Sequence, residues 1–255
     1  MGRFFITGSS DGLGSLTAKR LVSLGHQVVL HARNPQRAKH ANAACPGSTA
    51  ILTADLADLQ ETKRLAAEAN KHGPYDAVIH NAGVARSATI GKSLPSLFAV
   101  NTLAPYILTC LMAKPKRLVY VSSSMHYHGH PRLDDDGDGI TRSGYSDTKL
   151  HNVMLAKAFA RRWDNGNDSG SAVVNCCATD PGWVATKING WSGRADLTDA
   201  VDMFTKLALG ELQKGNGQYF ADGREKSPNA KAGDVQLQDR MLEELAKISG
   251  VAVPE

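Results

Sequence analysis

A tyrosine and a lysine with complementary chemistry stand four positions apart, at Tyr145 and Lys149. The segment from about Gly144 to Trp163 has the apolar pattern of a long helix, and this spacing places both side chains on one helix face. Because a nearby ammonium favours the phenolate, we expect Lys149 to lower the Tyr145 pKa from its usual value of ~10. Tyr145 could then donate a proton to a carbonyl oxygen or accept one from an alcohol. Such pairs also occur by chance, so the interpretation depends on the rest of the chain.

A glycine-rich turn follows the first apolar run of the chain. It comprises Thr7-Gly8-Ser9-Ser10-Asp11-Gly12-Leu13-Gly14, between a predicted strand at Arg3–Thr7 and a predicted helix at Leu13–Leu24. Small residues let the backbone approach a pyrophosphate, and the N–H groups at a helix N-terminus bind anions. The position of this turn at the first strand–helix junction favours a dinucleotide site over an ordinary turn.

The elements that must position these residues alternate along the chain. Further strands are predicted at Gln27–His31, Ala50–Thr53, Ala77–His80, Leu118–Ser122 and Ala172–Cys177, and further helices at Pro35–Asn42 and Leu59–Lys71. Apolar strands alternating with helices predict a parallel sheet covered on both faces. We therefore expect a doubly wound α/β fold in a single domain over residues 1–255, with a nucleotide-binding half of about 1–122 and a catalytic, substrate-binding half of about 123–255.

Further motifs follow the glycine-rich turn in a definite order. They are Asp55-Leu56, Asn81-Ala82-Gly83, Asn101, Ser123, Tyr145-x-x-x-Lys149 and Pro181-Gly182-Trp183-Val184-Ala185-Thr186. Together with Thr-Gly-x-x-x-Gly-x-Gly, this series resembles the short-chain dehydrogenase/reductase family, whose fold is Rossmann-like. Near the C-terminus, Gly217-Gln218-Tyr219-Phe220 and a predicted helix at Gln236–Ile248 resemble the retinol-dehydrogenase-like and WW-domain-oxidoreductase-like branch.

The resemblance implies hydride transfer between a nicotinamide and a small-molecule carbonyl or alcohol. It assigns Tyr145 as general acid or base, Lys149 as its partner and ribose ligand, Ser123 as the substrate-oxygen ligand and Asn101 as the holder of a water, with Ser124 in reserve for Ser123. The cofactor contacts that it implies, besides Tyr145 and Lys149, are Gly8, Ser9, Ser10, Asp11, Gly12, Leu13, Gly14, Asp55, Leu56, Asn81, Ala82, Gly83, Pro181, Gly182, Val184 and Thr186. Among these, the resemblance implies that Asp55-Leu56 contacts the adenine.

The end of the second predicted strand bears on which nicotinamide is used. It reads His31-Ala32-Arg33-Asn34, without an Asp or Glu to accept from the ribose hydroxyls of NAD. Arg33 can instead form a charge-assisted fork with a 2′-phosphate. The sequence therefore favours NADP(H) as cofactor, against the alternative of a solvated arginine.

Composition and charge restrict partners and compartment. The net charge of +4 includes no concentrated basic run, so we expect no nucleic-acid partner. The four cysteines lack metal-ligand spacing, and we expect no metal. We also expect a cytoplasmic protein with no membrane segment, because no run of ~18 apolar residues is present. The long helix starting at Tyr145 is apolar almost all round, which suggests a homodimer through that helix.

Two alternatives to a reductase and one alternative site stay open. A non-catalytic NADP(H)-binding regulator could share the fold, although the intact set of Asn101, Ser123, Tyr145 and Lys149 argues against it. A sugar-nucleotide epimerase or dehydratase would need a longer substrate domain after Thr186. Finally, His126, His128 and His130 alternate like metal ligands on a strand. Their place just after Ser123 favours the substrate mouth, with zinc as the minor alternative.

Overall fold

A mostly parallel sheet forms the centre of the computed structural model, which describes residues 1–86, 94–133, 139–164, 174–185, 192–193, 196–212 and 214–254. The eight strands of these ranges lie in the order β3-β2-β1-β4-β5-β6-β7-β8. They are β1 (Arg3–Ile6), β2 (Gln27–Ala32), β3 (Ala50–Thr53), β4 (Ala77–His80), β5 (Arg117–Val121), β6 (Asn175–Asp180), β7 (Gln218–Ala221) and β8 (Arg224–Glu225). Every neighbouring pair is parallel except β7 with β8. This order confirms the predicted doubly wound α/β fold.

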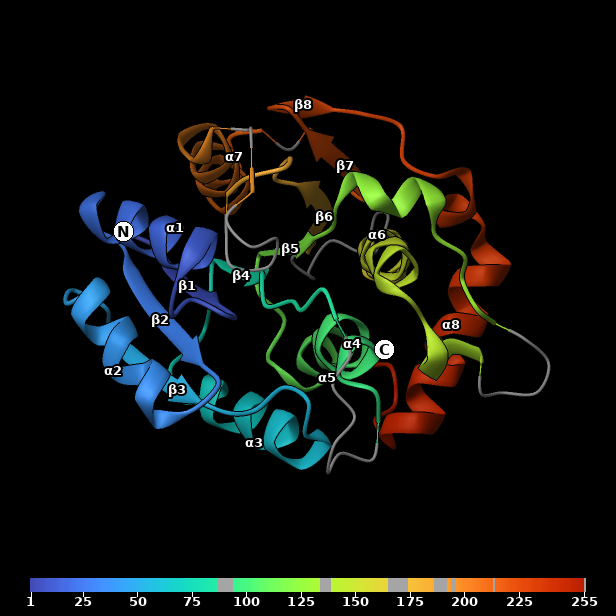
Figure 1. Cartoon of the computed structure of the whole chain (residues 1–255), viewed down its shortest axis with the longest axis horizontal. Coiled ribbons are helices and arrows are strands. Elements are labelled where there is room, and N and C mark those ends of the chain that lie inside the picture. The colour runs from blue at the N-terminus through green and yellow to red at the C-terminus, as the bar shows by residue number, and fades with distance from the viewer. Residues whose placement is uncertain are drawn as a thin grey trace.

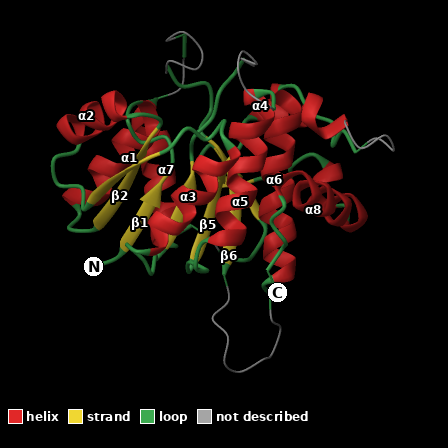
Figure 2. Cartoon of the chain, turned by 90° about the horizontal axis from the view of Figure 1, so that it is seen from below, coloured by secondary structure: helices red, strands yellow, loops and turns green. Residues whose placement is uncertain are grey.

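Helices cover both faces of the sheet (Figures 1 and 2). They are α1 (Gly12–Ser23), α2 (Pro35–Ala44), α3 (Leu59–Asn70), α4 (Ser96–Phe98), α5 (Ala104–Leu111), α6 (Tyr145–Arg162), α7 (Leu197–Leu209) and α8 (Val235–Ser249). In Figure 1, α1 and α7 lie on one side of the strands, and α3, α5 and α6 lie on the other. No helix of the described residues is both long and apolar enough to cross a bilayer.

The two faces of the sheet belong to two separate hydrophobic cores. In β1, Phe4 and Ile6 pack into the core shared with α1, α2 and α7, whereas Phe5 packs into the core shared with α3, α5, α6 and α8. Successive side chains of a strand point to opposite faces, so an uninterrupted apolar run can fill both cores. The buried apolar strands of the sequence thus produce a three-layer arrangement.

Most predicted boundaries agree with the structure to within a few residues. The sixth strand differs most, because it begins at Asn175 and extends to Asp180 rather than covering Ala172–Cys177. The sequence also did not indicate α5, α7 and β7 as separate elements. Helix α6 begins at Tyr145 because Gly144 is its N-cap, and the Asp147 carboxylate accepts a hydrogen bond from the Gly144 N–H at 3.0 Å.

The apolar circumference of α6 is covered within the chain. Met154, on the face from which a homodimer was predicted, is fully buried in the single chain. Helix α8 packs against α6, and Figure 1 shows it outside α6 on the side away from the strands. The hydroxyl of Tyr106 on α5 donates a hydrogen bond to the Val251 carbonyl at 2.7 Å, which holds the segment after α8 in place. Helix α8 therefore covers part of α6 within the chain, and the homodimer through this helix stays a prediction.

Candidate active site

The candidate residues gather where the parallel strands end. The strand order reverses direction between β1 and β4, and in such sheets ligands bind outside the carboxyl ends of the strands at this switch point. The glycine-rich turn follows β1, Asn81 follows β4, and Ser123 lies just after β5. One edge of the sheet thus collects motifs that are far apart in the sequence.

The glycine-rich turn and the Asn-Ala-Gly motif contact each other directly. The Asn81 amide nitrogen donates hydrogen bonds to the carbonyls of Thr7 and Gly8 at 2.9 and 3.0 Å, and the Ala82 N–H donates to Thr7 Oγ1 at 3.0 Å. Gly8 has φ of +64°, and a Cβ there would lie 2.8 Å from the Ala82 Cα. Only glycine fits this position, because both the conformation and the close approach exclude a side chain.

The N-terminus of α1 offers backbone donors to a ligand. Its N-cap, Asp11, makes no side-chain capping bond to the helix, and its carboxylate instead pairs with Arg37. The first N–H groups of a helix have no partner within the helix, so this end of α1 is suited to an anion. Ser9 serves the turn itself, since its buried hydroxyl donates to the Ile6 carbonyl at 2.9 Å.

Asn101 is held in an irregular helical turn. It lies at the centre of the π-helical stretch Ala99–Leu103 between α4 and α5, a type of bulge that is frequent at functional sites. Its side-chain oxygen accepts from the Val84 N–H at 2.8 Å, and its amide nitrogen donates to the Val84 carbonyl at 2.9 Å and to Thr148 Oγ1 at 3.1 Å. Asn101 thereby links the segment after β4 to the first turn of α6.

Lys149 is buried at the edge of the sheet. Its Nζ donates a hydrogen bond to the Val121 carbonyl, the last residue of β5, at 2.9 Å. A Cβ on Gly83 would lie 3.5 Å both from this Nζ and from the Asn101 Oδ1, so the three predicted residues border one small space. Burial lowers the pKa of Lys149 to about 8, and the negative charge of Asp180 partly opposes this effect.

Tyr145 lies one turn before Lys149, whose Nζ is 5.5 Å from the centre of the tyrosine ring. Its side chain is hydrogen-bonded to Ser123, so the structure brings Ser123 rather than Ser124 to the phenol. The pKa of Tyr145 is raised, because burial outweighs the hydrogen bond from Ser123 and the charge of Asp180 acts in the same direction as burial. The prediction of a lowered pKa was therefore wrong for this structure, in which the Lys149 ammonium points to a carbonyl and burial dominates.

These contacts join the predicted motifs into one site at the carboxyl edge. The short chain dehydrogenase family model matches residues 3–195. The chain belongs to this family. An uncharacterized oxidoreductase of Emericella nidulans is 46% identical to it, over 100% of this chain and 99% of the relative. Human retinol dehydrogenase 13 is 28% identical over 98% of this chain and 85% of that protein, which agrees with the predicted branch.

Solved structures show the same fold. The crystal structure of an uncharacterized protein from Mycobacterium Paratuberculosis superposes with a TM-score of 0.79 and covers 100% of this chain and 96% of that one. Its sequence identity of 24% supports the fold alone.

A buried carboxylate in this dehydrogenase was not predicted. Asp180 ends β6, is 6% exposed, and accepts a hydrogen bond from the Gly182 N–H at 2.9 Å. Its charge acts on Tyr145, Lys149 and His126. The signal in the sequence was an acidic residue directly after an apolar strand and directly before the Pro181-Gly182 loop.

The remaining loop residues of the predicted site are partly described. Val184 is buried and Trp183 is 67% exposed, whereas Thr186 lies outside the described residues.

On the nucleotide side, Arg33 is exposed and Ala32 is buried. Sequence reasoning missed Arg37, which lies in the first turn of α2, four residues after Arg33, and could have been found by its place after the strand end.

The segment after β3 folds into a tight turn. The Asp55 carboxylate accepts a hydrogen bond from the Ala57 N–H at 3.0 Å, and the Asp55 N–H donates to the Glu61 carboxylate at 2.7 Å. Leu56 is 5% exposed. Both predicted contacts thus lie in a segment that β3 brings to the carboxyl edge of the sheet.

The three histidines after Ser123 do not lie on a strand. His126 and His128 belong to a 3-10 helix at Ser124–His128, and His130 follows this helix. The His126 Nδ1–H donates a hydrogen bond to the Ser123 carbonyl at 2.7 Å, while His130 Nδ1 lies 3.0 Å from Lys231 Nζ. Across the described part of the chain, no group of three or more His, Cys, Asp or Glu is arranged to hold a metal ion.

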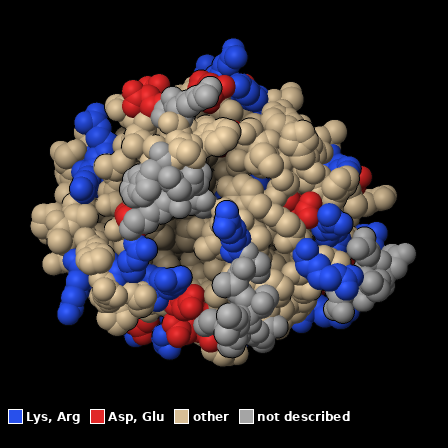
Figure 3. Space-filling view, viewed as in Figure 1, with Lys and Arg blue, Asp and Glu red and all other residues tan. Residues whose placement is uncertain are grey.

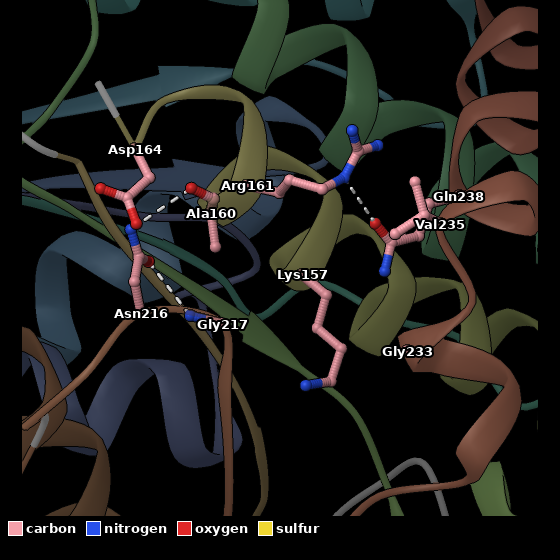
Figure 4. A pocket seen from close by; sticks show the side chains of 9 residues that line it. All are labelled: Lys157, Ala160, Arg161, Asp164, Asn216, Gly217, Gly233, Val235 and Gln238. Carbon is pink, nitrogen blue, oxygen red and sulfur yellow. Dashed lines mark hydrogen bonds between the residues drawn. The ribbon is translucent and has the colours of Figure 1, made fainter. Parts of the chain in front are cut away.

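Other surfaces of the dehydrogenase provide weaker candidates for a binding site. An open pocket of about 440 Å³ lies at the C-terminal end of α6, between Lys157, Arg161 and Gln238 (Figure 4). Arg161 already donates to Gln238 at 3.2 Å and to Asp239 at 2.5 Å, so its charge is engaged. On the face shown in Figure 3, basic and acidic side chains are interspersed rather than gathered into one patch.

Proposed function

We propose that this chain is an NADP(H)-dependent oxidoreductase that transfers a hydride between the nicotinamide and a small carbonyl or alcohol substrate. The observation that carries the proposal is the grouping of the candidate residues at the carboxyl ends of the strands. There Tyr145 is hydrogen-bonded to Ser123, and Lys149 lies beside the tyrosine ring. An ordinary surface helix would not bury its lysine against the end of a neighbouring strand. Membership of the family supports the general reaction.

The side chains divide the chemistry among them. Tyr145 would donate its phenolic proton to the carbonyl oxygen in reduction and accept a proton from the alcohol in oxidation. Its raised pKa keeps the phenol protonated at neutral pH, which suits the role of acid in reduction. Ser123 would bind the same oxygen and stabilise the charge that develops on it. Asn101 would hold a water beside Lys149, and Tyr145 would regain its proton through this water.

The nucleotide end fits a dinucleotide. The N-terminus of α1, whose N-cap side chain makes no bond to the helix, offers backbone donors to a pyrophosphate. Gly8 and Gly14 let the turn pack closely against Ala82 and Asn81. When bound, the nicotinamide supplies or accepts the hydride. We propose residues 1–122 as the nucleotide-binding half and residues 123–255 as the catalytic half. Asp55, Leu56, Gly83, Gly182 and Val184 would complete the contacts, and Thr186 would extend them.

The choice of NADP(H) rests on the cations at the end of β2. Arg33 is exposed and therefore accessible to a ligand, and no acid precedes it. Arg37 lies on the same side of the turn, because it pairs with Asp11 of the glycine-rich turn. The Arg33 guanidinium favours a 2′-phosphate over a bare ribose diol, whereas the charge of Arg37 is already matched by the Asp11 carboxylate.

Substitution of Tyr145 by Phe tests the proposed reaction. The change removes the proton donor and leaves the glycine-rich turn intact, so kcat with NADPH and a reactive aldehyde or ketone should fall by about 10²- to 10⁴-fold. The dissociation constant of NADPH, measured by fluorescence titration, should change little.

Tyr127→Phe is the matched control, because Tyr127 lies near Ser123 but its hydroxyl donates to the Ser227 carbonyl at 2.7 Å. Its kcat should stay within about twofold of the parent, since hydrogen bonds of this exposed kind contribute little. A Tyr145→Phe variant as active as the parent would refute the proposed role. A parent that binds NADPH but reduces no member of a carbonyl panel would favour the non-catalytic regulator.

A further inference from the structure

A fully buried histidine lies behind the glycine-rich turn. His31 is the fifth residue of β2 and is 2% exposed. Both of its ring nitrogens make hydrogen bonds to the backbone. Nδ1 is bonded to the Gly8 N–H at 3.0 Å, and Nε2 to the Ala54 carbonyl at 2.9 Å. Because a backbone N–H can only donate and a carbonyl can only accept, the ring must be neutral, with its proton on Nε2. Burial supports this state by lowering the pKa of His31 to about 4.

The backbone of His31 is bonded to the same turn. Its carbonyl accepts from the Ser9 N–H at 3.0 Å, and its N–H donates to the Ser9 hydroxyl at 2.9 Å. The Ser9 hydroxyl in turn donates to the Ile6 carbonyl at 2.9 Å. The turn after β1 is therefore joined to β2 by hydrogen bonds that involve both the backbone and the ring of His31. The bond to Gly8 is the one that depends on the side chain being histidine.

The two backbone groups that the ring joins lie in two different parts of the nucleotide site. Gly8 begins the turn proposed for the pyrophosphate. Ala54 directly precedes Asp55 and Leu56, the segment proposed for the adenine, and its own N–H donates to the Ala32 carbonyl at 3.1 Å. A rigid imidazole between them fixes the distance from the first segment to the second. These segments follow β1 and β3, which lie on either side of β2 in the sheet (Figure 1).

We propose that His31 is a positioning residue for the dinucleotide, whose ring holds the pyrophosphate turn and the adenine segment at the separation that the cofactor requires. The inference rests on the proposed function, since it presupposes that the turn binds a nicotinamide dinucleotide. A preformed site binds more tightly because the ordering of its loops is not required during binding. Tyr145 and Lys149 lie on α6 with no contact to this ring, so the chemical step should not depend on it.

Two substitutions test the two hydrogen bonds of the His31 ring separately. In His31→Asn the shorter amide can accept from Gly8 but cannot reach Ala54. In His31→Gln the longer amide can donate to Ala54 but leaves the Gly8 N–H without its acceptor. Each buried group that loses its partner weakens the assembled site, and we expect the NADPH dissociation constant to rise about tenfold in both variants. At saturating NADPH, kcat should stay within about twofold of the parent.

His151→Gln is the control for the loss of any buried histidine. Its ring is likewise bonded at both nitrogens, to Thr102 Oγ1 at 3.1 Å and to the Pro131 carbonyl at 2.8 Å, but it lies on α6, away from the turn. This variant should lose stability without a change in NADPH affinity. Hydrogen exchange of the nucleotide-free His31 variants gives a second measurement, in which residues 7–14 and 54–57 should exchange faster while Tyr145–Lys149 does not.

The outcomes distinguish the role of His31 from the proposed function. A parent that binds NADPH, together with His31 variants that are less stable but bind it equally well, would overturn the positioning role alone. A parent that binds neither NADPH nor NADH would overturn the proposed function and this role with it. If neither amide variant folds, His31→Leu fills the buried position without a polar group and makes neither hydrogen bond, and an NADPH affinity equal to the parent's in that variant would overturn the positioning role.

Discussion

Replacement of Lys149 by Met should stabilise the protein at neutral pH while it abolishes turnover. Lys149 is 3% exposed, and burial lowers its pKa from 10.5 to about 8. Below pH 8 the folded protein must keep the ammonium charged in this buried place, and at about 1.4 kcal/mol per pKa unit the cost is about 3 kcal/mol. Met fills a similar volume without a charge. It gives up the charge-assisted hydrogen bond to the Val121 carbonyl, which costs about 2 kcal/mol.

The lost bond does not leave that carbonyl without a donor, because Asn152 Nδ2 also donates to it at 3.1 Å. The net expectation at pH 7 is a gain of about 1 kcal/mol in the free energy of unfolding, or roughly 2–4 °C in Tm. The gain is fully present below pH 8. It shrinks as the pH rises from 8 towards 10.5, because in this window the unfolded lysine binds more protons than the folded one and the parent becomes more stable.

Urea denaturation of parent and variant at pH 7, 8, 9 and 9.5 measures both the gain and its pH dependence. Lys116→Met is the control, since the Lys116 side chain is 69% exposed and pairs with Asp76 at the surface. That variant should show no gain that depends on pH in this range. A Lys149→Met protein that is less stable than the parent at pH 7, or whose advantage does not change with pH, would refute the assignment of a strained, buried ammonium.

Three further predictions follow from the site and the core. Asp180→Asn keeps an acceptor for Gly182 but removes the charge that raises the Tyr145 pKa, so the alkaline limb of kcat/KM for carbonyl reduction should move to lower pH. Asp180→Glu should not move this limb, and identical profiles for all three proteins would exclude the charge effect. Arg33→Ala should weaken NADPH by about 10- to 100-fold and scarcely affect NADH, whereas an equal loss of both cofactors in titrations would mean that Arg33 does not contact the 2′-phosphate. Met154→Ala should lower the free energy of unfolding by about 2–5 kcal/mol without changing the sedimentation coefficient of the folded protein, and a stable variant that sediments differently would support the dimer through α6.

The order of the fold and the residues of the candidate site could be predicted because their signals are local. A strand of this sheet is a short apolar run, and the turn after β1 needs glycine at Gly8 for its conformation. The spacing of Tyr145 and Lys149 is a property of one helix. These features depend on neighbours along the chain, so they can be predicted without knowledge of the fold.

What the tertiary structure decided concerns contacts between distant segments. How far the apolar surface of α6 is covered within the chain depends on where the last helix packs, which no local pattern specifies. The direction of the Tyr145 pKa depends on how deeply the phenol is buried and on Asp180, a residue on another element. His31 looked like an ordinary strand residue, and only the arrangement of β1, β2 and β3 placed its ring between Gly8 and Ala54. Burial and long-range electrostatics are sums over the whole molecule, so they become defined only once the chain has folded.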